Sequence, residues 1–256
     1  MTPRWNAIIL AAGRGPHDRL AKAYGVANKC AIEVAGKPML ARVVQALHES
    51  GSVASILVSI EDRAIAHAIL GNRAATIASA GSAPASVIAA VGRGAITYPI
   101  LITTADHALL TPAMVHHFCR SSERAAADFT AGLATAETVL AAYPKTIRTF
   151  FRLGKTRLAG CNLFALHNER GLKLLARWQH LERIRKNPWR LVAVFGVLPL
   201  LRFIVGTLDI DAALAIVSRK FGLQVKAVLM PFAEAAIDVD KPADKDLAEL
   251  ILAQRL

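Results

Sequence analysis

Residues 6–15 read NAIILAAGRG, a short apolar run that ends in a glycine-containing turn. A continuous apolar run of this length, followed directly by glycine, is typical of a buried strand that leads into a tight turn. Glycine lets the backbone approach a ligand closely, and successive backbone N–H groups in such a turn can bind phosphate oxygens. The stretch therefore predicts a buried first strand that delivers a phosphate-facing turn.

Strands and helices alternate from this turn to the middle of the chain. We expect strands at 55–60, 74–78 and 100–104, and helices at 39–50, 62–70, 86–92 and from Thr111-Pro112 onward. This alternation predicts an α/β, Rossmann-like fold: a mostly parallel sheet with helices on both faces. Ligands of such sheets bind beyond the carboxyl ends of the strands, where the glycine turn and Asp106 are both expected.

The second half of the chain is less regular. We expect strands at 128–131, 149–152, 163–166 and 225–229, an almost entirely helical stretch at about 170–217, and a closing helix at 244–256. The length fits one domain with an insertion. We therefore predict a single domain over 1–256 with a helical cap or insertion at about 170–217.

The net charge and the cysteines indicate the cellular location and the classes of partner. The net charge is +12, and the three cysteines are far apart in the sequence. A reducing, cytoplasmic location follows from the cysteines. The charge suits nucleic acid, an anionic membrane surface or phosphorylated small molecules. Because the basic cluster at 177–202 is mixed with tryptophan and a long apolar stretch, it resembles an interfacial surface, and we expect no nucleic-acid partner but possible peripheral contact with the inner membrane.

The apolar side chains of the helical stretch have two interpretations. Pro199 and Arg202 interrupt the stretch 191–208, so a membrane-spanning helix is not expected. The side chains in question are Trp178, Ile184, Trp189, Val192, Phe195 and Leu198. We favour a buried cap core for them over an amphipathic, membrane-facing surface.

The glycine turn belongs to a larger pattern. It is followed by Lys29 and by Gly36-Lys37-Pro38-Met39-Leu40. An ordinary strand-to-helix turn accounts for the glycines but not for all of these features together. The combination resembles the signature of nucleotidyltransferases with a glycosyltransferase-A-like fold, such as molybdenum-cofactor guanylyltransferases and the sugar-phosphate and isoprenoid cytidylyltransferases.

The resemblance implies a set of site residues. The nucleotide-binding positions would be Leu10, Ala11, Ala12, Gly13, Arg14, Gly15, Lys29, Gly81, Ser86 and Asp106. Arg14 and Lys29 would stabilise the polyphosphate, and Asp106 and Asp240 would bind the Mg²⁺ cofactor, which prefers hard carboxylate ligands. These four are the predicted catalytic residues.

Three alternatives stay open on the sequence alone. The step from the glycine turn to Lys29 is longer than the family pattern, so Arg19 can replace Arg14 and Lys22 can replace Lys29. Asp240 and its neighbour Asp238 also fit a charged turn or a helix cap.

An acceptor site is expected near Gly160-Cys161-Asn162, which resembles the acceptor-facing turn of related transferases. Gly160 and Asn162 would line it, and Lys145 and Arg152, with Arg148 and Lys155 nearby, would hold an acceptor phosphate. A plain hairpin and a solvated basic face are the competing interpretations.

The expected activity is Mg²⁺-dependent transfer of a nucleoside monophosphate from a nucleoside triphosphate, CTP or GTP by preference, to a phosphorylated acceptor with release of pyrophosphate. The acceptor would be a small molecule or lipid-linked. One alternative is a glycosyltransferase of the same fold, although such enzymes commonly have an Asp-x-Asp where this chain has only Thr104-Ala105-Asp106. The other is a non-catalytic nucleotide-binding or membrane-docking protein.

Overall fold

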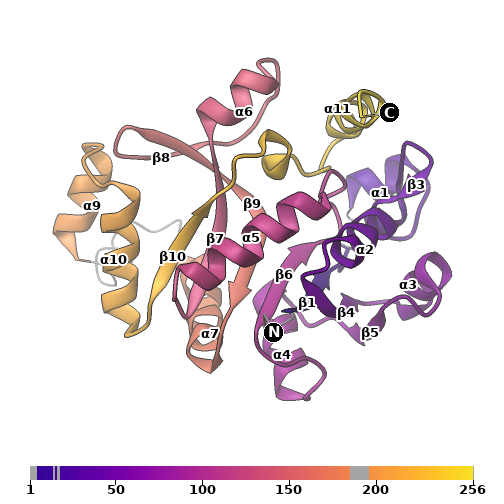
Figure 1. Cartoon of the computed structure of the whole chain (residues 1–256), viewed down its shortest axis with the longest axis horizontal. Helices are drawn as coiled ribbons and strands as arrows, with labels where there is room; N and C mark the ends of the chain where they lie inside the picture. The colour runs from indigo at the N-terminus through magenta and orange to yellow at the C-terminus, as the bar shows by residue number, and fades with distance from the viewer. Residues whose placement is uncertain (1–4, 14, 16–17, 185–195, 256) are drawn as a thin grey trace.

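The computed structural model describes residues 5–13, 15, 18–184 and 196–255, with only the backbone described at 178–184. Its strands are β1 (Trp5–Leu10), β2 (Glu33–Val34), β3 (Lys37–Pro38), β4 (Val53–Ile60), β5 (Ala75–Ala78), β6 (Ile100–Thr104), β7 (Phe129–Thr135), β8 (Phe151–Leu153), β9 (Thr156–Leu166) and β10 (Val225–Leu229). All except the β2–β3 hairpin join one sheet (Figure 1).

The helices lie around this sheet. They are α1 (Arg19–Ala23), α2 (Met39–Glu49), α3 (Arg63–Leu70), α4 (Ala83–Gly92), α5 (Pro112–Arg124), α6 (Ala136–Ala142), α7 (Glu169–Ile184), α9 (Val197–Ile204), α10 (Ile210–Phe221) and α11 (Pro242–Ala253). The short 3₁₀ helices are η2 (Lys29–Ala31) and η3 (Ala233–Ala236). Thr111 caps α5 and Pro112 opens it, as the Thr-Pro pair predicts.

The strand order is β10-β7-β9-β6-β1-β4-β5, with β8 paired to β9. β1 runs parallel to β4 and β6, β4 to β5, and β7 to β10, whereas β9 runs antiparallel to both β6 and β7. The predicted Rossmann-like, mostly parallel sheet with helices around it is thus confirmed. Strands 100–104 and 225–229 have the predicted bounds.

Alternate residues of each strand face opposite helical layers. Ile9 belongs to the core under α2, α3 and α5, while Ile8 belongs to the core under α4 and α7. A smaller third core joins Leu20 of α1 and Val34 of β2 to Ile251 of α11. This third core packs α11 against α1 and β2, at the edge where β1 and β6 end.

Three expectations need correction. Gly160-Cys161-Asn162 is not a turn: these residues lie within the long antiparallel strand β9. The segment 128–166 also includes the helix α6, which strand periodicity did not reveal. Leu198 is 68% exposed, so it does not belong to a buried cap core.

The helical stretch after β9 divides into parts with different environments. α7 and α10 contribute Leu174, Leu214 and Val217 to the core on one face of the sheet. α9 has no buried residue among its side chains. The other apolar side chains predicted for the cap, at positions 178–195, lie outside the side chains that the structure describes. No helix in the described part of the chain is long and apolar enough to cross a membrane.

Candidate functional site

A cleft of about 800 Å³ opens where the carboxyl ends of β1, β4 and β6 meet. Most of the predicted nucleotide-binding residues line it: Leu10, Ala11, Ala12, Gly13, Gly15, Lys29, Gly81, Ser86 and Asp106, together with Asn162 and Asp240. The parallel strand order places these distant segments at one edge of the sheet, as expected for this class of fold.

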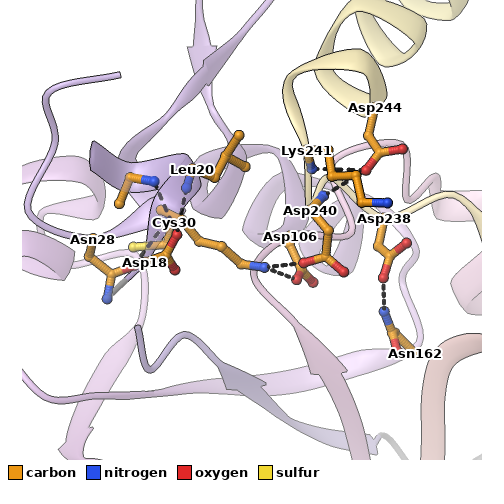
Figure 2. A network of polar contacts seen from close by, with 12 residues as sticks. Asp18, Leu20, Asn28, Cys30, Asp106, Asn162, Asp238, Asp240, Lys241 and Asp244 are labelled. Atoms are coloured by element: carbon orange, nitrogen blue, oxygen red, sulfur yellow. Dashed lines mark hydrogen bonds and ion pairs between the residues drawn. The ribbon is translucent and has the colours of Figure 1, made fainter. Parts of the chain in front are cut away.

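One end of the cleft is acidic. One carboxylate oxygen from each of Asp106, Asp238 and Asp240 can be chosen so that all three lie within 4.8 Å of one another. Lys29 lies between two of these groups: its Nζ is 2.6 Å from Asp106 Oδ2 and 2.7 Å from Asp240 Oδ1. Figure 2 shows Asp106, Asp240 and Asp238 converging from the end of β6 and from the loop before α11.

Lys29 stays charged in this environment. Burial opposes its charge, but the carboxylates of Asp106 and Asp240 outweigh that effect and raise the pKa of the ammonium above its usual value. Its position is set by Asn28, whose side chain accepts a hydrogen bond from the Cys30 N–H and so caps η2. The alternative, Lys22, is exposed and is not part of the contacts made by Lys29.

Asp238 is held by a largely buried arginine side chain. Arg148 Nη1 lies 2.6 Å from Asp238 Oδ1, and Arg148 Nη2 donates to the Asp238 carbonyl oxygen at 3.1 Å and to Asp244 Oδ1 at 3.0 Å. Burial and then the charges of Asp106 and Asp240 raise the pKa of Asp238, although Arg148 opposes this. Arg148, considered before as an acceptor-phosphate ligand, is therefore committed to the acidic end of the cleft.

The loop before α11 is fixed by the first turn of that helix. Asp244 Oδ2 accepts hydrogen bonds from the N–H groups of Asp240 and Lys241. The Val239 N–H donates to the carbonyl oxygen of Asp106 at 3.1 Å, which ties this loop to the end of β6. The cap that the sequence suggested is thus real, but Asp244 provides it, and Asp240 remains directed to Lys29.

The opposite end of the cleft is built around Glu61, which directly follows β4. Its carboxylate accepts from the Gly13 N–H at 3.1 Å and from Asn28 Nδ2 at 2.8 Å. Asn28 Nδ2 also donates to the Ala11 carbonyl oxygen at 2.9 Å. A Cβ atom at Gly13 would lie 3.0 Å from Glu61 Oε1, so a larger residue there would press on the Glu61 side chain.

The segment after β5 completes this end. Ser86 Oγ accepts from the Ala80 N–H at 2.9 Å, and Ser82 Oγ accepts from the Ala85 N–H at 3.2 Å. Gly81 lies between these two turns, and a Cβ atom there would meet nothing within 4 Å. The backbone of 79–83 is therefore held in place while its surface toward the cleft stays open.

Asn162 reaches the cleft because β9 is irregular. It has a left-handed φ of +49°, and the register between β7 and β9 shifts at this point. Asparagine tolerates this backbone conformation better than most residues. The bulge directs Asn162 Nδ2 to Asp238 Oδ2 at 3.3 Å (Figure 2).

The remaining predicted residues are distributed differently. Gly160 lines an adjacent cleft of about 230 Å³ with Arg148, Asp238 and Lys241, whereas Lys145 and Arg152 line neither cleft. Arg14 lies outside the described residues.

Arg19, the alternative to Arg14, lines a third cleft of about 550 Å³ that also includes Lys29 and Asp240. Glu61, Asn28 and Asp244 were missed, because nothing in the sequence near them marks their distant backbone partners.

The acidic end suits a divalent cation. Asp106 Oδ1 is buried and has no hydrogen-bond partner among the described residues, although the other oxygen of the same carboxylate binds Lys29. An unpartnered buried carboxylate oxygen is unfavourable unless something else binds it. Here three carboxylates face two cations, Lys29 and Arg148, so the local charge remains negative. Oxygen ligands in a negatively charged cluster are what Mg²⁺ prefers.

Comparison with known proteins identifies a matching family and similar solved structures. The profile of the MobA-like NTP transferase domain matches residues 7–186. A hypothetical transferase from Thermus thermophilus superposes with a TM-score of 0.79 at 26% identity, over 95% of this chain and 100% of that chain. No curated protein matches the sequence.

Two more distant structures share the fold. CMP:2-keto-3-deoxy-manno-octonic acid synthetase, complexed with CTP, has a TM-score of 0.61 at 13% identity over 99% of this chain and 100% of that one. The 4-diphosphocytidyl-2C-methyl-D-erythritol synthase from Anaerococcus prevotii has a TM-score of 0.60 at 13% identity, over 98% of each chain.

Proposed function

The chain belongs to the MobA-like NTP transferase family, and on this basis we propose that it transfers a nucleoside monophosphate from a nucleoside triphosphate to a phosphorylated acceptor, releasing pyrophosphate. The observation that carries the proposal is the group formed by Asp106, Asp238, Asp240 and Lys29, at one end of a cleft whose other end is lined by backbone amides and small side chains. The two ends suit the two halves of a nucleotide.

The nucleoside belongs at the end lined by Gly13, Gly81 and Ser86. The Glu61 carboxylate occupies the Gly13 N–H, and a negative group beside the turn disfavours a phosphate there, in contrast to the phosphate-facing turn that the sequence predicts. A base with an exocyclic amino group could donate to this carboxylate, which argues against UTP. The structural relatives include a synthetase complexed with CTP, which agrees with this preference.

The triphosphate belongs at the acidic end. Asp106, with Asp240 and Asp238, would hold Mg²⁺, whose charge would allow a polyanion to approach these carboxylates and would stabilise the leaving pyrophosphate. Lys29, which keeps its proton, would contribute a second positive charge. Arg19 lines the neighbouring cleft, which shares Lys29 and Asp240 with the main cleft. It is a candidate for contact with the leaving pyrophosphate.

The reaction needs no nucleophilic side chain. An oxygen of the acceptor phosphate attacks the α-phosphorus, a new O–P bond forms, and the bond to the β-phosphate oxygen breaks with pyrophosphate leaving. Positioning and charge neutralisation supply most of the catalysis in such transfers. Asn162 and the cleft beside Gly160 and Lys241 offer the approach for the acceptor. A phosphorylated small molecule and a phosphorylated lipid are both compatible with this opening.

A thermal-shift experiment tests the donor. The protein is heated with each of the four nucleoside triphosphates, with and without Mg²⁺, and with nucleotide sugars for comparison. We expect one triphosphate, CTP or GTP, to raise the unfolding temperature only when Mg²⁺ is present.

Pyrophosphate release is then measured for that triphosphate with a panel of sugar, polyol and lipid phosphates. Stabilisation by nucleotide sugars alone would support the glycosyltransferase alternative. Absence of any nucleotide effect would overturn the assignment of the site.

A further inference from the structure

Helix α9 exposes apolar side chains at an unusual density. Eleven large apolar side chains are exposed in the described part of the chain, and six of them lie on residues 197–205. They are Val197, Leu198, Leu201, Phe203, Ile204 and Val205, with exposed fractions between 48% and 73%. Scattered single apolar residues are normal on a surface, but a contiguous patch of this kind marks an interaction site.

Five of these side chains share one face of the helix. Positions 197, 198, 201, 204 and 205 follow the i, i+1, i+4, i+7, i+8 spacing that brings residues together on a helix. None of the three hydrophobic cores that the described residues form includes a residue of α9. The face is therefore apolar without being part of the interior.

The helix is nevertheless anchored. The carbonyl oxygen of Arg202 accepts from the N–H groups of Thr207 and Leu208, and the side chain of Leu208 is buried. Asp209 then caps α10, which packs on the sheet. α9 is thus presented by a fixed turn next to the main core.

The neighbouring β8–β9 hairpin is strongly basic. Arg152 and Arg157 are directly opposed across the two strands, and Lys155 lies in the turn between them. None of the ion pairs formed among the described residues involves these three side chains. Like charges placed opposite each other destabilise a hairpin unless an anion compensates them.

The basic hairpin and the apolar helix are adjacent. The guanidinium carbon of Arg152 lies 3.7 Å from the position of a Cβ atom at Gly206, in the turn after α9. Gly154 in the hairpin is in similar contact with Asp209. Figure 1 shows β8 and α9 on the same side of the molecule, away from α3 and β5. Phe151, 41% exposed, adds an aromatic side chain on β8.

We propose that α9 and the β8–β9 hairpin form a docking surface for an anionic lipid bilayer. An exposed apolar face beside uncompensated arginine and lysine matches the chemistry of an interfacial helix, which inserts apolar side chains below anionic headgroups.

A second copy of the chain is a poorer occupant, because a two-fold contact would place this basic hairpin near its own copy in a protein of net charge +12. The proposal goes beyond nucleotidyl transfer and does not depend on it.

Vesicle sedimentation tests the proposal. The full chain is mixed with vesicles of phosphatidylcholine alone or of phosphatidylcholine with phosphatidylglycerol, and the bound fraction is measured. We expect binding to the anionic vesicles, a loss of about tenfold in Leu201→Glu, and a loss of about fivefold in Arg152→Glu that high salt reproduces in the wild type. Leu250→Glu, an equally exposed leucine on α11, is the matched control and should bind as the wild type does.

Three further measurements keep the result decisive. Circular dichroism and the nucleotide-dependent thermal shift should be unchanged in Leu201→Glu, since this side chain lies outside the cores and the clefts. Light scattering gives the mass in solution. A dimer that dissociates in Leu201→Glu would overturn the proposal in favour of self-association. Equal binding of Leu201→Glu and wild type, or no binding of the wild type to anionic vesicles, would also overturn it.

Discussion

The two ends of the main cleft are stabilised by opposite means. At the acidic end, charged side chains from distant segments oppose one another: Lys29 joins Asp106 to Asp240, and Arg148 holds Asp238. At the other end, neutral backbone groups are fixed by single side chains, of which Glu61 is the clearest. The charged side chains at the acidic end can exchange partners when a cation or an anion binds. The other end, which is lined by Gly13, Glu61 and the backbone of 79–83 and is called the amide end, is already formed. The difference predicts distinct consequences for mutations at the two ends.

The largest effect is expected for Asp106→Asn. Asparagine keeps the shape of the side chain but removes the charge that would bind Mg²⁺ and that pairs with Lys29. We expect pyrophosphate release to fall about a thousandfold, the scale of losing one main electrostatic group in an active site. The matched control is Asp246→Asn on the exposed side of α11, which should change the rate little. A rate above a tenth of the wild-type value in Asp106→Asn would contradict the assignment.

Lys29→Met separates two roles at the acidic end. The ammonium now binds both Asp106 and Asp240, so it competes with a divalent cation for their oxygens. We expect the variant to bind Mg²⁺ alone more tightly than the wild type, yet to bind the Mg²⁺-triphosphate about a hundredfold more weakly, because a charge near the phosphates is lost. Titration calorimetry measures both affinities. Lys22→Met is the control, and parallel losses of both affinities in Lys29→Met would argue against competition.

Much of the frame could be predicted from the sequence. The apolar runs at Asn6–Leu10 and Ile100–Thr104 are buried strands, as their short length and isoleucine content predicted. Their parallel pairing then brings Gly13 and Asp106 to one edge without further information. Local sequence patterns were sufficient to predict these site residues, because the order of the parallel strands alone brings them together.

The rest depended on contacts that no local pattern encodes. Arg148 and Asp238 are 90 residues apart in the chain, and the pair forms only because the segment between α6 and β8 meets the loop before α11. Asn162 was expected in a turn, but a bulge within β9 gives it the same access to the cleft. Hydrophobicity alone did not distinguish α9 from a core helix. An apolar sequence indicates that a helix prefers burial, but it does not indicate which surface covers the helix.

Two glycines sharpen the comparison at the amide end. A Cβ atom at Gly81 meets nothing within 4 Å, so Gly81→Ala should fold normally and weaken triphosphate binding about tenfold by occupying the cleft. At Gly13 the added atom would press on Glu61 Oε1 and on Asn28 Nδ2, at 3.1 Å, so Gly13→Ala should lose about 1–2 kcal/mol of stability as well. Gly92→Ala in α4 is the control. Chemical denaturation and calorimetry distinguish the two outcomes, and equal stabilities of the two cleft variants would contradict this difference.

The smallest effect concerns Cys30, which lines the cleft beside Glu61. Burial, and then the charge of Glu61, raise the pKa of this thiol to about 12. Because the unfolded chain loses this proton near pH 9, the contribution of Cys30 to stability is complete below pH 9 and is lost as the pH rises toward 12.

The native thiol should therefore resist iodoacetamide at pH 8, because it stays protonated there. Glu61→Gln should increase the labelling of Cys30, measured by mass spectrometry of its peptide. Labelling of Cys119 should stay the same, because burial and then the charge of Glu123, not Glu61, raise the pKa of that thiol. Rapid labelling of Cys30 in the native wild type would show that the amide end opens to solvent, and would remove the contrast with the acidic end.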